Sequence, residues 1–198
     1  MSSKSYLIVG HGGQGVLDLG NFIAYDAISH GQKVAYTPSY GPETRGGKVR
    51  CYVIKSDEEI DSPIVDEPDV LVAMNNPSMD FETAVKPKGL LLMNSSLIDR
   101  LQTRKDIEAV RIPATEIAEG MKNEGVDLAD TKVLQNAVMY GAVMASENEA
   151  INEEQTRTVL AHVYSGTKSR FIPANLKAIL RGDGFVRASG RLCQLWGS

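Results

Sequence analysis

The sequence predicts an α/β fold, a single Rossmann-like domain in which a mainly parallel sheet is flanked by helices. Two observations carry this prediction. Short apolar runs typical of buried strands alternate along the chain with helix-like segments. A glycine-rich loop joins the first such strand to the first helix. The chain has 198 residues, which is enough for one such core and too few for two comfortable ones.

Each expected strand is a short apolar or β-branched run bounded by polar residues, glycine or proline. The expected strands cover residues 6–9, 33–37, 48–54, 70–74, 90–93 and 108–112. The expected helices cover residues 16–30, 76–85, 132–146, 153–164 and 173–180. Strands that alternate with helices at this spacing favour a parallel sheet with helices on both faces. We therefore expect one domain over residues 1–180 and a C-terminal tail over residues 181–198, which has no clear period and is either frayed or docked on a partner.

Composition excludes several classes of protein. The net charge of −4, and the lack of Lys/Arg clusters interleaved with aromatic residues, argue against nucleic acid as a partner. No run of 18 apolar residues occurs, so we expect a soluble, cytoplasmic protein with no membrane partner. The two cysteines, Cys51 and Cys193, cannot supply four ligands to an iron-sulfur cluster or a structural zinc ion. Neither a metal site nor a convincing catalytic nucleophile is expected in this chain.

The glycine loop is the first candidate binding site. Gly10, Gly12 and Gly15 satisfy the pattern G-x-G-x-x-G between an apolar strand and a helix. Glycines let the backbone approach a ligand closely, and the amides and dipole of a helix N-terminus favour a phosphate. A tight turn without a ligand is the structural alternative. An NAD site would need a carboxylate about 20 residues further on, and residues 34–40 contain none.

Four polar loops are expected to meet at the carboxyl edge of the sheet, where open α/β sheets bind ligands. They are residues 10–15, residues 39–47, the pair Asn75-Asn76, and residues 94–96. The two asparagines could equally cap a helix. Glu43 and Arg45 could form a general acid and an anion clamp, or a structural ion pair.

Asn136 lies in an apolar helical segment, so its amide needs a buried partner. We expect that partner to be a peptide group of the glycine loop.

Three ordered motifs make the chain resemble a known family. Residues 10–16, 38–47 and 56–63 closely resemble the gamma subunit of 2-oxoacid:ferredoxin oxidoreductases, the family that acts on pyruvate, 2-oxoglutarate and ketoisovalerate. The resemblance covers at least residues 6–141. The helix over residues 136–142 also fits, although Tyr140 stands where a leucine is more usual.

The resemblance implies a subunit of a multi-subunit enzyme. Such complexes decarboxylate a 2-oxoacid on thiamine diphosphate, pass electrons through iron-sulfur clusters to ferredoxin, and transfer the acyl group to coenzyme A. Thiamine diphosphate, its Mg²⁺ and the clusters then belong to the alpha, beta and delta subunits, and coenzyme A is bound here as a substrate. This chain alone is expected to be inactive, and 2-oxoglutarate is the expected 2-oxoacid.

The loop motif and the resemblance together give the expected coenzyme A site. It comprises Gly10, Gly12, Gly13, Gln14, Gly15, Ser39, Glu43, Arg45, Asn76 and Asn136. None of these is expected to be catalytic. Two alternatives remain: a stand-alone Rossmann-type nucleotide-binding oxidoreductase, and a structural scaffold whose glycine loop is only a turn.

Overall fold

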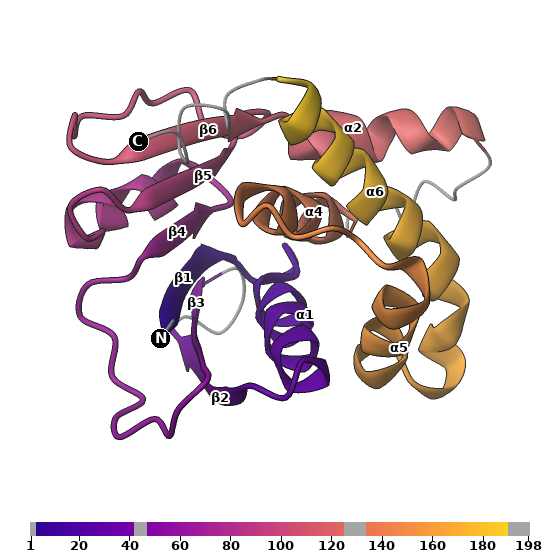
Figure 1. The fold of residues 1–198 in the computed structure, drawn as a ribbon. Helices are drawn as coiled ribbons and strands as arrows, with labels where there is room; N and C mark the ends of the chain where they lie inside the picture. The colour runs from indigo at the N-terminus through magenta and orange to yellow at the C-terminus, as the bar shows by residue number, and fades with distance from the viewer. Residues whose placement is uncertain (1–2, 42–46, 125–133, 190–198) are drawn as a thin grey trace.

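The computed structural model describes residues 3–41, 47–124 and 134–189. Six strands form one sheet (Figure 1). They are β1 (Lys4–His11), β2 (Lys33–Tyr40), β3 (Lys48–Ser56), β4 (Val70–Ala73), β5 (Leu90–Asn94) and β6 (Glu108–Ile112). The α-helices are α1 (Val16–Ser29), α2 (Ala114–Gly120), α4 (Gln135–Ser146), α5 (Glu153–Val163) and α6 (Ile172–Ala188). The 3-10 helices are η1 (Asn76–Ala84), η2 (Met121–Glu124) and η3 (Gly166–Phe171).

The sheet is mainly parallel, as predicted. Its strand order is β2-β3-β1-β4-β5-β6. β1, β4, β5 and β6 pair in parallel, whereas β3 is antiparallel to both β1 and β2. β2 therefore runs in the same direction as β1, and the two strands end at the same edge of the sheet.

The α-helices gather on one face of the sheet (Figure 1), and the 3-10 helix η1 covers part of the other face, so helices flank both faces as predicted but the α-helices flank only one. On the other face, alternate residues of the strands pack against η1 and against Ile98 and Ile107 of the β5–β6 connection. The connection from β4 to β5 contains the 3-10 helix η1, which begins at Asn76, and the described structure places no α-helix between β5 and β6. Because neither connection contains an α-helix, fewer apolar side chains cover this face, and it carries the smaller of the two apolar clusters.

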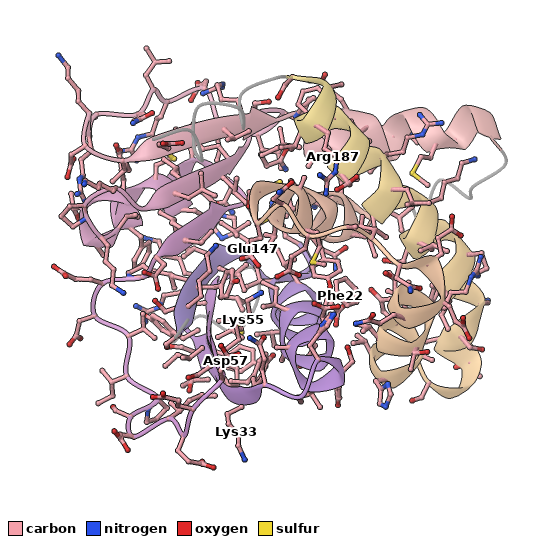
Figure 2. The ribbon with its side chains drawn as sticks, viewed as in Figure 1. Phe22, Lys33, Lys55, Asp57, Glu147 and Arg187 are labelled. Atoms are coloured by element: carbon pink, nitrogen blue, oxygen red, sulfur yellow. The ribbon has the colours of Figure 1, made fainter. Side chains whose placement is uncertain are left out.

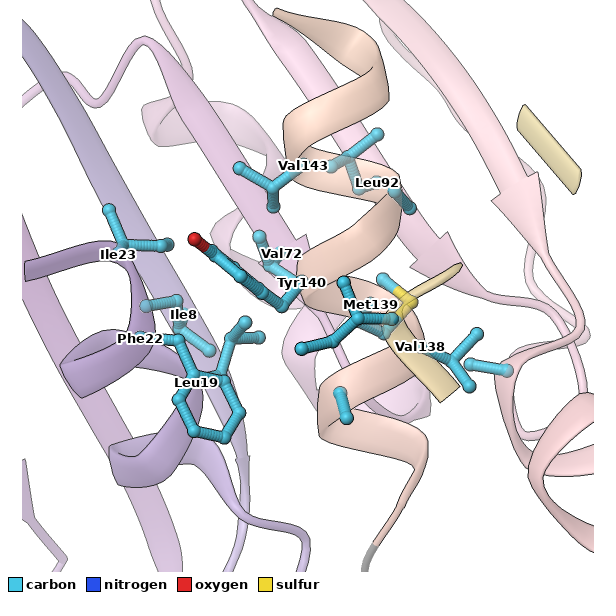
Figure 3. Packing of buried hydrophobic residues seen from close by; sticks show 14 of the residues in the cluster. Ile8, Leu19, Phe22, Ile23, Val72, Leu92, Val138, Met139, Tyr140 and Val143 are labelled. Carbon is cyan, nitrogen blue, oxygen red and sulfur yellow. The ribbon is translucent and has the colours of Figure 1, made fainter. Parts of the chain in front are cut away.

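Helix α4 is the centre of the larger cluster, and every one of its 12 residues is buried. Its side chains reach the sheet at Val72 and Leu92 and reach α1 at Phe22 (Figure 3). The rings of Tyr140 and Phe22 lie 5.5 Å apart. A helix that is apolar all round can be stable only when other elements cover it on every side.

α6 supplies the outer cover of α4 and crosses it at very short range. A Cβ built on Gly141 would lie 2.0 Å from the carbonyl oxygen of Ile179. A Cβ built on Gly182 would lie 1.9 Å from the carbonyl oxygen of Val138. Only glycine at these two positions allows the backbones to approach so closely.

Two elements extend three or more residues past their predicted ends. The helix expected to end at residue 180 continues to Ala188, because Val186 is fully buried and Arg187 pairs with Asp183 one turn earlier. The second strand continues past Thr37 to Tyr40, because β2 is an edge strand and an edge strand tolerates Pro38. Cys193 and the rest of the tail beyond residue 189 lie outside the described residues. No helix in the described ranges is long and apolar enough to cross a bilayer.

Candidate functional site

The carboxyl edge of the sheet brings the predicted loops together. β1, β2, β4 and β5 all end at this edge, where they lead into the glycine loop, Gly41, Asn75 and Ser95 respectively. After β1 the chain turns toward β2, and after β4 it turns toward β5 on the other side. β1 and β4 are neighbours, so their ends flank the kind of crevice that binds ligands in α/β folds.

The glycine loop presents free backbone amides at the start of α1. Gly15 is the N-cap of α1 with φ +72°, and Gly13 has φ +92° with open space around the position of a Cβ. The amide of Gly12 donates to the carbonyl of Gly47 at 3.2 Å. Among the described residues, the amides of Gly13 and Gly15 have no protein acceptor. Such amides at a helix N-terminus form an anion-binding site.

Gln14 ties the ends of β1 and β4 together. Its Oε1 accepts hydrogen bonds from the backbone amide of His11 at 2.8 Å and from Asn75 Nδ2 at 2.6 Å. Its Nε2 donates to the carbonyl of Met74 at 3.3 Å. A Cβ on Gly10 would lie 2.9 Å from Gln14 Oε1, so Gly10 leaves the room that this side chain occupies. The side chain of Gln14 is thus used in shaping the loop.

Asn136 holds the other side of the loop, as the sequence predicted. The residue is fully buried, and its Nδ2 donates to the carbonyl of Gly15 at 3.3 Å. Its Oδ1 accepts from the amide of Ala137 at 2.8 Å. A Cβ on Gly15 would lie 2.4 Å from Asn136 Nδ2. Gly15 is therefore required both for its backbone conformation and for this close contact.

The two adjacent asparagines after β4 also bond to protein groups. Asn75 caps η1 by accepting from the amide of Ser78 at 3.2 Å. Asn76 Nδ2 donates to Asp99 Oδ1 at 2.7 Å, and its Oδ1 accepts from the amide of Asp99 at 3.2 Å. Asn76 thus joins η1 to the segment after β5 rather than lining the glycine loop.

Ser39 lies on the η1 face of the sheet. It pairs with Arg50 across the β2–β3 ladder, and Arg50 Nη2 donates to Ser39 Oγ at 3.4 Å. The guanidinium of Arg50 lies 5.6 Å from the centre of the Phe81 ring, which belongs to the smaller cluster. Glu43 and Arg45, the remaining predicted site residues, lie outside the described residues.

A groove of about 310 Å³ opens beside the loop. It is lined by His11, Gly12, Gly13, Gly15, Val16, Leu17, Asp18, Tyr40 and Val49. Tyr40 is 66% exposed and was not among the predicted site residues. The signal that could have revealed it is the alternation of side chains along a strand, but the predicted strand ended before Tyr40.

Asp18 brings a carboxyl group to the groove, and His11 brings a buried ring nitrogen. Asp18 lies in the first turn of α1, and burial raises the pKa of its carboxyl group. Tyr164 donates a long hydrogen bond of 3.4 Å to Asp18 Oδ2. The Nδ1 atom of His11 is buried and has no hydrogen-bond partner within the described structure. Buried polar atoms rarely lack a hydrogen-bond partner, so this ring nitrogen is open to a hydrogen bond with a ligand group in the groove.

A second polar cavity, of about 400 Å³, lies at the opposite edge of the sheet. Its charged groups are already paired, since Lys55 Nζ lies 2.6 Å from Glu147 Oε2 and 3.2 Å from Glu149 Oε1 (Figure 2). In the same cavity, His30 Nδ1 lies 3.7 Å from Asp26 Oδ2. The glycine-loop groove, by contrast, has open amides and is the better candidate site.

The described residues hold no cluster of metal-binding side chains, and their one cysteine, Cys51, is buried. No group of three or more His, Cys, Asp or Glu side chains in the described ranges could hold a metal ion. Cys51 is fully buried, and burial raises the pKa of its thiol to about 12. Cys51 therefore packs as a small apolar residue.

Comparison with known proteins places the chain in a family. The family model described as pyruvate ferredoxin/flavodoxin oxidoreductase matches residues 5–183. The ketoisovalerate oxidoreductase subunit VorA of Methanothermobacter marburgensis is 39% identical over 91% of this chain. The chain spans only 36% of the length of that relative. The 2-oxoglutarate synthase subunit KorC of Methanocaldococcus jannaschii is 32% identical over 90% of this chain and 91% of its own length.

Solved structures share the fold. The gamma subunit of a keto/oxoacid ferredoxin oxidoreductase from Geobacter sulfurreducens superposes with a TM-score of 0.73 at 24% identity, over 93% of this chain and 99% of that one. A 2-oxoglutarate:ferredoxin oxidoreductase from Magnetococcus marinus, with 2-oxoglutarate, coenzyme A and succinyl-CoA bound, superposes with a TM-score of 0.81 at 22% identity. The match covers 95% of this chain and 32% of that chain. The family match and the KorC relative confirm the resemblance seen in the motifs: the chain belongs to the pyruvate ferredoxin/flavodoxin oxidoreductase family.

Proposed function

We propose that the chain is the gamma subunit of a multi-subunit 2-oxoacid:ferredoxin oxidoreductase and binds coenzyme A at the glycine loop. The observation that carries the proposal is the pair of unpartnered amides, Gly13 and Gly15, in a groove at the N-terminus of α1. The pyrophosphate of coenzyme A is the anion that these amides would bind. The pantetheine arm then extends from the loop and presents its thiol for acyl transfer at a neighbouring subunit.

The other cofactors are proposed to belong to partner subunits. Thiamine diphosphate with its Mg²⁺ and the iron-sulfur clusters would be held by alpha, beta and delta subunits, and ferredoxin would accept the electrons. The two cysteines of these 198 residues are too few for a four-cysteine cluster site, which supports this division of labour. A stand-alone oxidoreductase is not favoured, because the relatives are named as subunits.

We propose 2-oxoglutarate as the 2-oxoacid. The KorC relatives support it because the match to one of them extends over 91% of its length. The VorA relatives, which are more identical to this chain but much longer, support ketoisovalerate instead. Turnover with each 2-oxoacid by the purified complex decides between the two substrates.

The loop can supply only part of the affinity. An anion at a helix N-terminus is stabilised by about 0.3–1 kcal/mol when exposed and up to about 2 kcal/mol when partly buried. Micromolar binding needs about 8 kcal/mol. Contacts to the adenine and the pantetheine must therefore provide most of the binding free energy.

The proposal is tested by replacing Gly13 with valine in the purified complex. A Cβ at φ +92° is strained and blocks the approach of a phosphate to the amide. Gly31→Val is the matched control, because Gly31 has φ +79° and open surroundings but follows the far end of α1. We expect Gly13→Val alone to raise the apparent KM for coenzyme A, by about two- to 30-fold, with an unchanged KM for the 2-oxoacid.

Equal coenzyme A dependence in Gly13→Val and Gly31→Val would show that the loop is only a turn. The isolated chain provides a second test. It should show no 2-oxoacid-dependent dye reduction with added thiamine diphosphate and coenzyme A, and turnover comparable to that of the complex would contradict the proposed role.

A further inference from the structure

Tyr40 lines the groove from the edge strand β2. Gly10 pairs with Val49, and Val49 pairs with Tyr40, so these three residues lie in one row across β1, β3 and β2. Side chains of directly paired residues point to the same face of a sheet. Val49 belongs to the cluster on the α-helical face, so the Tyr40 side chain lies on the same face as α1.

The row sets the distance between the Tyr40 ring and the glycine loop that carries the free amides. Neighbouring strands lie about 4.8 Å apart, so Tyr40 is roughly 10 Å from Gly10 across two strand spacings. The loop and the ring line the same groove, Val49 lies between them in the row, and Leu17 adds a further apolar side chain to the lining. A ligand with a phosphate at one end and a flat ring at the other fits this arrangement.

The Tyr40 ring is largely exposed and makes no contact with another aromatic ring in the described structure, so it is free to contact a ligand. The residue is 66% exposed, although it lies in line with buried Val49. No ring contact within the described structure involves Tyr40, whereas Tyr140 and Tyr164 both pack against Phe22. A tyrosine ring on a groove wall is a platform on which a nucleobase can stack.

We propose that Tyr40 binds the adenine ring of the ligand by stacking, while the glycine loop binds its pyrophosphate. The inference rests on the proposed function and adds the residue that recognises the base. Tyr40 is thus a specificity-determining residue: it favours ligands that carry an adenine over those that carry the pyrophosphate or the pantetheine alone.

The test measures ligand binding to the full-length chain purified with its accompanying subunits. The probes are coenzyme A, adenosine 3′,5′-bisphosphate and inorganic pyrophosphate. Stacking of a base on an aromatic side chain is worth about 1–3 kcal/mol by alanine substitution, which corresponds to about 5- to 150-fold in Kd. Tyr40→Ala should weaken both adenine-containing ligands by that factor and leave pyrophosphate binding unchanged.

Two variants serve as controls. Tyr40→Phe keeps the ring and should bind all three probes within about two-fold of wild type. Phe185→Ala removes an exposed aromatic ring on α6, far along the chain from the groove, and should have no effect.

Three results would overturn the inference. Unchanged coenzyme A binding in Tyr40→Ala would show that the ring does not contact the base. Equal loss of pyrophosphate binding would show a general disturbance of the groove. Loss of the accompanying subunits would assign Tyr40 to a subunit interface. By contrast, a wild-type protein that binds neither coenzyme A nor pyrophosphate would refute the proposed function itself.

Discussion

The crossing of α4 and α6 permits a sharp prediction about Gly182. An added Cβ would lie 1.9 Å from the carbonyl oxygen of Val138, and the contact must open by about 1 Å to reach the 3.0 Å below which real Cβ atoms essentially never lie. The obstacle is backbone in a fully buried helix, so it cannot rotate away. Overpacking of this kind costs typically about 1–3 kcal/mol, and the upper end applies here. Alanine returns about 1 kcal/mol through its higher helix propensity. The net destabilisation is about 2 kcal/mol.

Gly184 is the matched control, since it lies two positions further along the same helix and a Cβ there meets nothing within 4 Å. Gly184→Ala should gain up to about 1 kcal/mol. For a chain of this length, 1 kcal/mol shifts the melting temperature by about 2–4 °C. Thermal unfolding followed by circular dichroism should show Gly182→Ala lower by about 4–8 °C and Gly184→Ala higher by about 2–4 °C. Equal melting temperatures for the two variants would refute the account of helix crossing.

Three further predictions concern charge and the loop. Gln14→Met keeps the side-chain volume but removes the hydrogen bonds to His11, Asn75 and Met74. We therefore expect a higher KM for coenzyme A and a slightly lower melting temperature. An unchanged KM would mean that these hydrogen bonds do not shape the loop. Asp18→Asn removes a negative charge from the groove and should lower the Kd for pyrophosphate by at least about two-fold at pH 7, whereas Asp66→Asn, remote from the groove, should not. Burial by itself would raise the pKa of the Glu147 carboxyl group, but Lys55 and Lys4 lower this pKa overall. The stabilisation that Glu147 provides is therefore present above the pKa of the unfolded state and is lost as the pH falls through the pKa of the folded state. Urea titrations should therefore show a loss of stability below about pH 4 that is smaller in Glu147→Gln; parallel pH profiles would contradict the pairing.

Much of the fold could be read from the sequence because its signals are local. The apolar runs that form β1, β4 and β5 are buried on both faces, so they need no register to be recognised. The glycine loop was recognised because positive φ angles at Gly13 and Gly15 demand glycine. The second strand was cut short because Pro38 resembles a turn signal, and nothing local indicates that its strand lies at the edge of the sheet.

The sequence predicted where the site lies better than it predicted what each side chain contacts there. The convergence of the loops follows from strand direction, which the parallel pattern supplies. Whether Gln14 or Asn76 faces a ligand or a protein group depends on partners as distant in the chain as Met74 and Asp99. Asn136 was the exception, because a buried amide must find a partner and the loop was the nearest polar backbone. Gly182 was assigned to a tail because its reason for being glycine lies in another helix.

The position of α6 also constrains how the chain reaches its folded state during synthesis. Every strand of the sheet is synthesised before α6, yet α4 gains its outer cover only when residues up to Ala188 have emerged. Until then α4, which has no surface position of its own, presents Val138 and Gly141 to solvent. Exposed apolar surface of this kind makes a partly synthesised chain prone to aggregation. A chain arrested near residue 180 would therefore contain every strand of the sheet while α4 still exposes apolar surface. Such exposed apolar surface is what a chaperone would bind.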